Sequence, residues 1–201
     1  MSLTPKTPIP EGAIRYNTDS NKMEVWIGDK WMIVSVSSPN LDGGSRGIMA
    51  GGFPGATSGQ DVIDYFNIES SGNAIDFGNL TDARWGIATG ASRTRALFAG
   101  GDSPGDVNII DFITIASKGD AQDFGNLSRA TSASGSNNSM AATSNSIRGL
   151  FAGGYLNAPS IVNNIDFITI ATTGNSADFG DLLTARRTFD GCSDSHGGIG
   201  E

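Results

Sequence analysis

The sequence has very few of the residues that build catalytic and metal-binding sites. Its 201 residues include a single cysteine, Cys192, and a single histidine, His196. One cysteine excludes an internal disulfide framework, and one histidine leaves no cluster of ligands for a soft metal, so any bound metal would need oxygen ligands. A nucleophilic site needs a base, and His196 lies in a glycine-rich tail with no recognisable serine or cysteine elbow nearby. We therefore expect a protein that is not an enzyme and that has no metal and no cofactor.

Positive charge is also scarce, with 13 Lys and Arg against 21 Asp and Glu and a formal net charge of −8. An acidic surface repels phosphate backbones and anionic membranes, so we expect neither nucleic acid nor a membrane as a partner. No apolar run is long enough for a membrane-spanning helix, and the N-terminus has no cationic segment followed by an apolar core, as a secretory signal would have. The sequence thus predicts a chain made in a cytoplasm that stays soluble or joins an assembly.

Helical periodicity is missing as well. No long stretch places apolar side chains at helical spacing without interruption by glycine or small polar residues. The 28 glycines, with abundant Ser, Thr, Asn and Asp, indicate many tight turns. These features predict an all-β fold.

Three imperfect copies of one phrase fill most of the chain. Each copy opens on an arginine, an apolar strand and a Gly-Gly pair, and continues through an Ile-Asp-Phe or similar strand to an Asp-Phe-Gly sequence. The openings begin 49 and 53 residues apart, at Arg46, Arg95 and Arg148. A period of this length predicts one small antiparallel sheet per copy, as in a propeller blade. Because both faces of these strands are apolar, each sheet needs a neighbour to cover it.

The copies set the expected organisation of the chain. We expect an extended arm at 1–12, a β-meander at 13–36, a linker at 37–45, repeats at 46–94, 95–147 and 148–195, and the start of a further copy at 196–201. The arm contains three prolines, and either is a disordered terminus or docks on a neighbouring subunit. In the meander, alternating residues predict three strands, with Gly28-Asp29 as a hairpin turn.

The meander supplies three candidate assembly residues, Tyr16, Trp26 and Trp31, because three short strands have little core of their own. The two tryptophans are read first as packing anchors, and the alternative is a platform that stacks on sugars. Two aromatic residues of the loops after Gly-Gly, Phe53 and Tyr155, are candidates for recognition, since these loops differ most between copies. The alternative is that the loops have drifted in sequence without binding a ligand.

Each repeat places an aspartate in the middle of an apolar strand, where an unpaired carboxylate is costly to bury. The recurrence of this residue in every copy favours a structural role over a unique catalytic one. We expect each aspartate to accept hydrogen bonds from the Gly-Gly turn or from a repeat arginine. The predicted structural residues are Asp64, Asp111 and Asp166, Arg46, Arg95 and Arg148, and the glycines Gly51, Gly52, Gly100, Gly101, Gly153 and Gly154.

Two other motifs are interpreted structurally. Asp-Phe-Gly also holds magnesium in protein kinases, but the kinase glycine-rich loop, strand lysine and His-Arg-Asp segment are missing, so we read it as a corner in which Phe is buried and Gly turns. Neither Asp102–Asp106 nor Asp190–Asp194 has the full ligand set of a calcium loop.

Two segments resemble known proteins. Residues 12–31, with Ile-Arg-Tyr-Asn, Lys-Met-Glu and a Trp after the Gly-Asp turn, resemble a short module found near the N-termini of tail-fibre and other appended structural proteins of tailed bacteriophages. The repeats, with Phe-Ala-Gly-Gly, Ile-Asp-Phe-Ile-Thr-Ile and Asp-Phe-Gly-Asp/Asn-Leu, are similar to kelch-like arrays in structural proteins of marine and cyanobacterial phages. The resemblance implies a structural component of the virion, in the tail fibre, the baseplate or the capsid surface.

The resemblance implies binding partners for the chain and leaves one alternative function open. Other virion proteins are the expected partners, together with copies of the same chain, and the homotrimer common among phage fibres is one such assembly. A host-surface glycan is a further expected ligand if the loops act in attachment. The alternative function is a self-contained kelch-type propeller that binds or processes carbohydrate. Since three copies do not obviously close a ring, either the array is longer than this chain or other subunits cover its ends.

Overall fold

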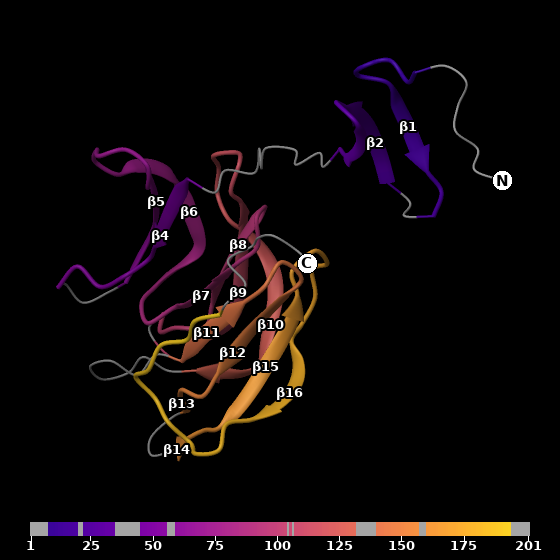
Figure 1. Cartoon of the computed structure of the whole chain (residues 1–201). Helices are drawn as coiled ribbons and strands as arrows, with labels where there is room; N and C mark the ends of the chain where they lie inside the picture. The colour runs from indigo at the N-terminus through magenta and orange to yellow at the C-terminus, as the bar shows by residue number, and fades with distance from the viewer. Residues whose placement is uncertain are drawn as a thin grey trace. The chain divides into compact units, whose positions relative to one another are not determined.

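A computed structural model describes residues 8–19, 22–34, 45–55, 59–103, 105, 107–131, 140–156 and 160–193. The chain divides into two compact units, residues 1–41 and 42–201, which are considered separately (Figure 1). All regular elements of the described residues are β-strands, which confirms the all-β prediction. The described part of the chain contains no helix long and apolar enough to cross a membrane.

The N-terminal unit is the predicted three-stranded meander, with β1 (Ile14–Asn17), β2 (Lys22–Ile27) and β3 (Lys30–Ile33). Gly28, at φ 67°, lies in the tight turn between β2 and β3. The register pairs Ile14 with Val25 and Val25 with Met32, and the alternation of side chains puts Tyr16 on the same face. That face is apolar, and the Trp26–Trp31 pair lies on the opposite one.

The second unit contains three antiparallel sheets, which we call the first, second and third sheet. The first sheet comprises β4 (Arg46–Ala50), β5 (Gln60–Asn67) and β6 (Ile75–Arg84); the second comprises β7 (Ala88–Ala91), β8 (Arg95–Ala99), β9 (Val107–Thr114) and β10 (Gln122–Thr131). The third comprises β11 (Ala141–Ser144), β12 (Arg148–Ala152), β15 (Asn164–Thr169) and β16 (Ala177–Asp181), and β13 (Tyr155–Leu156) forms a hairpin with β14 (Ser160–Ile161). Strands are adjacent in chain order within each sheet, apart from this inserted hairpin.

The three sheets repeat one register. Met49 lies opposite Asp64, Phe98 opposite Asp111, and Phe151 opposite Asp166. In each Gly-Gly pair both glycines have positive φ, from 62° to 114°, as expected for a turn that other residues adopt with difficulty. The Asp-Phe-Gly segment differs from the expected corner, because it lies inside β6, β10 and β16, and the register shifts there as in a β-bulge.

The sheets do not coincide with the expected repeat boundaries. The strand of small residues at the end of the expected first copy, β7, is hydrogen-bonded to β8, the opening strand of the next. β11 pairs with β12 in the same way. Each of these strands thus forms the edge of the sheet that follows it. The corresponding positions before β4 are residues 39–42, which lie outside the described residues. Three other expected segments also lie outside them, namely most of the linker, residues 1–7 of the arm and the start of a further copy at 196–201.

The sheets are stacked face to face in chain order, and two apolar clusters join them (Figure 1). The first cluster fills the space between the first and second sheets with Ile63, Phe77 and Leu80 on one side and Phe98 and Ile113 on the other. The second cluster joins the second and third sheets, where Leu97, Phe112, Phe124 and Leu127 meet Phe151, Ile168 and Ile170. The second sheet is therefore covered on both faces, as its apolar alternation requires.

Candidate functional site

A buried carboxylate joins the first and second sheets. Asp111 on β9 is fully buried and accepts hydrogen bonds from the backbone N–H and the hydroxyl of Thr81 on β6, at 3.1 and 2.7 Å. The guanidinium of Arg84 lies 3.0 Å from the same carboxylate and also donates to the Phe98 carbonyl. A buried carboxylate with a charge partner and two further donors offsets much of its desolvation cost. The aspartate therefore holds two sheets together.

The second and third sheets are joined in the same way. Asp166 on β15 is 3% exposed and accepts hydrogen bonds from the backbone N–H and the hydroxyl of Ser128 on β10, at 2.7 to 2.9 Å. Ser176 donates to it at 3.0 Å, and Arg129 lies 3.5 Å away. Serine here supplies the same two donors as threonine, one N–H and one hydroxyl, whereas the arginine lies one residue after the serine and not three residues after the threonine. We call these two sets of contacts the inter-sheet aspartate contacts.

The backbone repeats between the sheets as well. Gly119 and Ala121 donate to the carbonyls of Phe77 and Asn79, at 2.9 and 2.7 Å. Gly174 and Ser176 donate to the equivalent carbonyls of Phe124 and Asn126, at 2.7 and 2.8 Å. These bonds set the distance between successive sheets and give both interfaces the same geometry.

Asp64, the equivalent aspartate of the first sheet, differs from the other two. Its side chain is half-buried, and it makes no hydrogen bond or ion pair with the described residues. Its position in the register is the same as that of Asp111 and Asp166, so the difference comes from the neighbouring sheet and not from the sheet that carries it.

The repeat arginines have other partners than the predicted ones. Arg46 and Arg95 each donate to a carbonyl of the following sheet, that of Ile115 and that of Ile170, and do not contact the aspartates. All three arginines lie over an aromatic ring of their own sheet, with 5.3 Å between Arg46 and Tyr65, 4.5 Å between Arg95 and Phe112, and 5.1 Å between Arg148 and Phe167. The prediction that these arginines pair with the aspartates was wrong, because the donors come from the end of the preceding sheet.

Two donors to the buried aspartates, Thr81 and Ser128, were not predicted from the sequence. Both directly follow the leucine after Asp-Phe-Gly, and this shared position was the available signal. Arg84 is fully buried, and its Nε and Nη1 atoms have no hydrogen-bond partner among the described residues. The ion pair with Asp111 is thus the main compensation for a buried charge.

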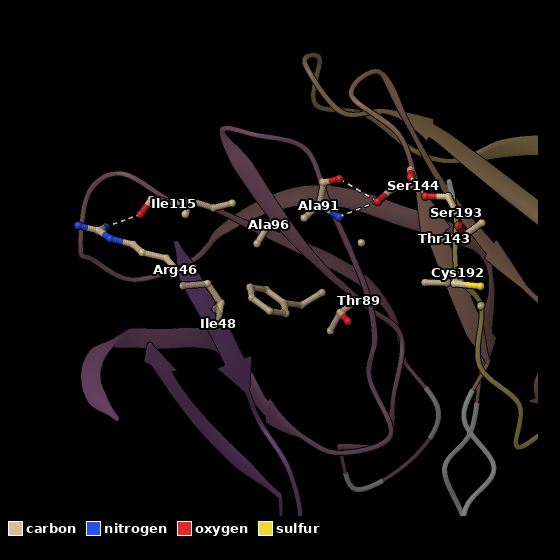
Figure 2. Close-up of a pocket in the computed structure, with 14 residues that line it drawn as sticks. Arg46, Ile48, Thr89, Ala91, Ala96, Ile115, Thr143, Ser144, Cys192 and Ser193 are labelled. Carbon is tan, nitrogen blue, oxygen red and sulfur yellow. Dashed lines mark hydrogen bonds between the residues drawn. The ribbon is translucent and has the colours of Figure 1, made fainter. Parts of the chain in front are cut away.

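A pocket of about 330 Å³ lies beside the small-residue edge strands (Figure 2). Ser144 on β11 exchanges hydrogen bonds with the backbone of Ala91 on β7, and Ser193 donates to the Ser144 carbonyl at 2.7 Å. β4 contributes Arg46 and Ile48 to the opposite wall. The pocket lies at the edge of β4 that corresponds to the edges of β8 and β12 covered by β7 and β11. Among the described residues, its lining contains hydroxyls, one thiol and Arg46, whose guanidinium donates to the Ile115 carbonyl, and no acid–base pair.

Of the two candidate recognition residues, Phe53 lies in the loop after Gly51-Gly52 and Tyr155 lies in strand β13. Phe53 is 54% exposed, and its ring centroid is 5.2 Å from that of Trp85. Tyr155 begins the β13–β14 hairpin, and the guanidinium of Arg187 lies 4.8 Å from its ring. Asp102 is buried and accepts a hydrogen bond from the Gly105 N–H, which gives it a role inside its loop.

The assembly candidates of the N-terminal unit divide between two faces. Trp26 and Trp31 meet edge to face with centroids 5.3 Å apart, and Arg15 lies over Trp31 at 4.2 Å. Arg15 and Asn17 donate to Glu24, and these hydrogen bonds lower the pKa of that carboxyl, with Asn17 the larger cause. The other face carries Tyr16 among exposed apolar side chains, namely Ile14, Met23, Ile27 and Met32.

No group of three or more His, Cys, Asp or Glu side chains in the described ranges could hold a metal ion, and His196, Asp106 and Asp194 lie outside these ranges. No protein-family model matches the chain, and no curated protein matches it.

Proposed function

We propose that this protein is a non-enzymatic structural component of a tailed-phage virion, in which a kelch-like array of sheets forms a rigid scaffold. The observation that carries the proposal is the repeated pair of inter-sheet aspartate contacts. Asp111 and Asp166 are buried, and each holds one sheet to the next. The resemblance of residues 12–31 to a tail-fibre module supports the attachment of this scaffold to other virion proteins.

In this proposal the two units have different tasks. The apolar face of the N-terminal meander binds virion proteins or further copies of the chain, since a three-stranded sheet with one uncovered apolar face gains stability by burying it. The sheets of the second unit are the blades of a kelch-like array and form the scaffold. Its mechanism is burial and shape, without turnover.

The test is the protein content of purified particles. Particles from the source that encodes this chain would be banded on a density gradient, examined by mass spectrometry and labelled with antibodies raised against the recombinant protein. We expect the chain in the particles at a fixed ratio to other structural proteins and the label at one location. The chain present in the lysate and missing from the particles would refute the proposal.

Carbohydrate binding is the second candidate function. The exposed ring of Phe53 beside the half-buried Trp85 favours it, because an exposed aromatic ring is a common surface for stacking on sugars. A glycan array with the wild-type protein and Phe53→Ala separates the two functions. Binding that Phe53→Ala abolishes would support attachment to a host surface, and hydrolysis of a bound glycan would support the enzyme alternative.

A further inference from the structure

The front face of the first sheet matches a surface that is covered elsewhere in the molecule. We define this front face by Met49, Asp64, Phe66 and Ile68, which occupy the register positions of Phe98, Asp111, Ile113 and Ile115 in the second sheet. Those four residues of the second sheet are at most 8% exposed because the first sheet covers them. Met49 and Ile68 are 62% and 65% exposed. The front face thus has the residues of an inter-sheet interface, and none of the described sheets of the second unit lies against it.

The back face of the third sheet shows the opposite half of that interface. We define it by Phe167, Phe179, Leu182, Leu183 and Arg186. Phe77 and Phe124 are each 2% exposed, whereas Phe179, at the same position after the aspartate, is 50% exposed. Leu183, at the position of Thr81 and Ser128, is fully exposed.

The glycines of the β-bulges independently indicate that the third sheet could accept a further sheet against its back face. A Cβ atom on Gly78 or Gly125 would lie 2.4 Å from a carbonyl oxygen of the following sheet, that of Gly119 or that of Gly174. A Cβ atom on Gly180 would meet nothing within 4 Å. The third sheet therefore has the backbone that admits a following sheet at close distance.

The two faces also carry complementary charges. Arg186 corresponds to Arg84, and the carbonyls of both residues accept a hydrogen bond from a Gly-Gly turn at 3.0 Å. Arg84 is paired with Asp111, whereas Arg186 is exposed and forms no ion pair with the described residues. Asp64 is an aspartate without its arginine, and Arg186 is an arginine without its aspartate. The second sheet separates them within one chain.

We propose that the back face of the third sheet binds the front face of the first sheet of a second copy of this chain, with Arg186 of one copy pairing with Asp64 of the other. The interface repeats the one between the first and second sheets, with Arg186 at the position of Arg84, except that Leu183 replaces the hydroxyl donor with apolar area. It is a head-to-tail interface, which closes into a ring or continues as a filament according to the rotation between copies. The inference rests on the proposed scaffold function and names the surface by which it assembles.

The first test uses two blocked variants of the full chain. Met49→Asp with Ile68→Asp blocks the front face, and Phe179→Asp with Leu183→Asp blocks the back face; all four positions are exposed in the single chain. The matched control is Ile161→Asp in the β13–β14 hairpin, which is 41% exposed and lies on neither face. Circular dichroism checks that each variant is folded, and light scattering over a range of concentrations measures mass.

The expected result has three parts. Wild type and Ile161→Asp associate with rising concentration, and each blocked variant alone associates at least about tenfold more weakly. Mixing the two blocked variants restores a one-to-one complex, because each contributes the face that the other lacks. A monomeric wild type, or blocked variants that associate as the wild type does, would overturn the proposal. Two folded blocked variants that do not combine would also overturn the proposal, because in a head-to-tail interface the intact front face of one variant must bind the intact back face of the other.

The second test exchanges the charges. Asp64→Arg and Arg186→Asp each weaken association, by about tenfold, and a mixture of the two recovers it because every contact then has opposite charges. If a mixture of the two folded variants does not recover association, the Asp64–Arg186 pair is contradicted. These tests are independent of the particle analysis: association in solution with no chain in the particles would refute the virion function alone, and a particle protein that stays monomeric would refute only this interface.

Discussion

The second and third sheets carry nearly the same sequence and have different surroundings. Phe124 and Phe179 each follow an aspartate and precede a glycine, and both pack edge to face on a phenylalanine of the adjacent strand, at 5.9 and 6.0 Å. Phe124 is covered by the third sheet and is 2% exposed, whereas Phe179 is 50% exposed. The contribution of a repeat residue is thus determined by the next sheet as much as by its own. Paired substitutions at equivalent positions measure this difference directly.

The largest difference is expected at the phenylalanines. Phe124→Ala removes a ring from a buried cluster and leaves a cavity, which should lower the free energy of unfolding by about 3 to 5 kcal/mol. Phe179→Ala should lower it by about 1 kcal/mol or less, since much of that ring is already in water. Urea unfolding under conditions where the protein is monomeric gives both values. Equal losses would show that the third sheet is covered in solution.

The next largest difference in unfolding free energy is expected for alanine substitutions at the glycines of the β-bulges. Gly125 and Gly180 both have φ of 142°, so alanine is strained at either position. Only at Gly125 does the added methyl group meet a backbone oxygen, that of Gly174 at 2.4 Å, and relieving this contact should cost about 1 to 3 kcal/mol more than at Gly180. The same unfolding measurement applies. A Gly180→Ala variant as unstable as Gly125→Ala would mean that backbone strain alone sets the cost.

A smaller effect is expected where the hydroxyl donor is exchanged. Ser128→Ala removes hydrogen bonds to the buried carboxylate of Asp166 and should destabilise the protein by about 1 to 3 kcal/mol. Leu183→Ser puts the same hydroxyl at the equivalent position of the third sheet, where no described carboxylate faces it, and should change stability by about 0.5 kcal/mol or less. Thermal unfolding of both variants beside the wild type checks the pair. If Leu183→Ser lowers stability as much as Ser128→Ala does, the claim that the hydroxyl matters only beside a buried carboxylate is contradicted.

The smallest effect concerns the N-terminal unit and serves as an internal reference. The pKa of Glu24 is lowered from its ordinary value of 4.5 by hydrogen bonds from Asn17 and Arg15. A carboxyl with a lowered pKa stabilises the folded state above its unfolded pKa, and this contribution disappears as the pH falls through the folded pKa. The meander should therefore lose stability below about pH 4.5, as followed by tryptophan fluorescence in a Trp85→Phe background. Glu24→Gln should remove this dependence, and an unchanged acid transition in Glu24→Gln would assign it to other groups.

Much of the architecture follows from the repeated phrase. The alternation in Ile165–Ile170 and its counterparts predicts strands covered on both faces, which holds for the second sheet but not for the outer faces of the first and third sheets. The recurrence of Asp64, Asp111 and Asp166 indicates a structural role, because a catalytic residue is normally unique. The turn at Gly28-Asp29 and the apolar face of the meander follow from local alternation in the same way.

The contacts between sheets are much harder to predict. Thr81 lies 30 residues from Asp111 and Ser128 lies 38 from Asp166, and the pairing of these residues depends on how whole sheets stack. The small-residue strand β7 closes the sequence phrase but pairs forward with β8, since hydrogen bonding follows the hairpin and not the repeat boundary. The exposure of Phe179 could not be derived at all, because its local sequence matches that of Phe124.

The role of the inter-sheet aspartate contacts is tested most directly by comparing the three repeat aspartates in one measurement. Asp111→Asn, Asp166→Asn and Asp64→Asn would be unfolded in urea at a concentration where light scattering shows a monomer. We expect a loss of about 3 to 5 kcal/mol for Asp111→Asn, which leaves Arg84 buried and unpaired, and a similar or somewhat smaller loss for Asp166→Asn. For Asp64→Asn we expect a change of about 0.5 kcal/mol or less. Equal losses at all three positions would contradict the claim that the inter-sheet contacts, and not the strands that carry the aspartates, give these residues their role.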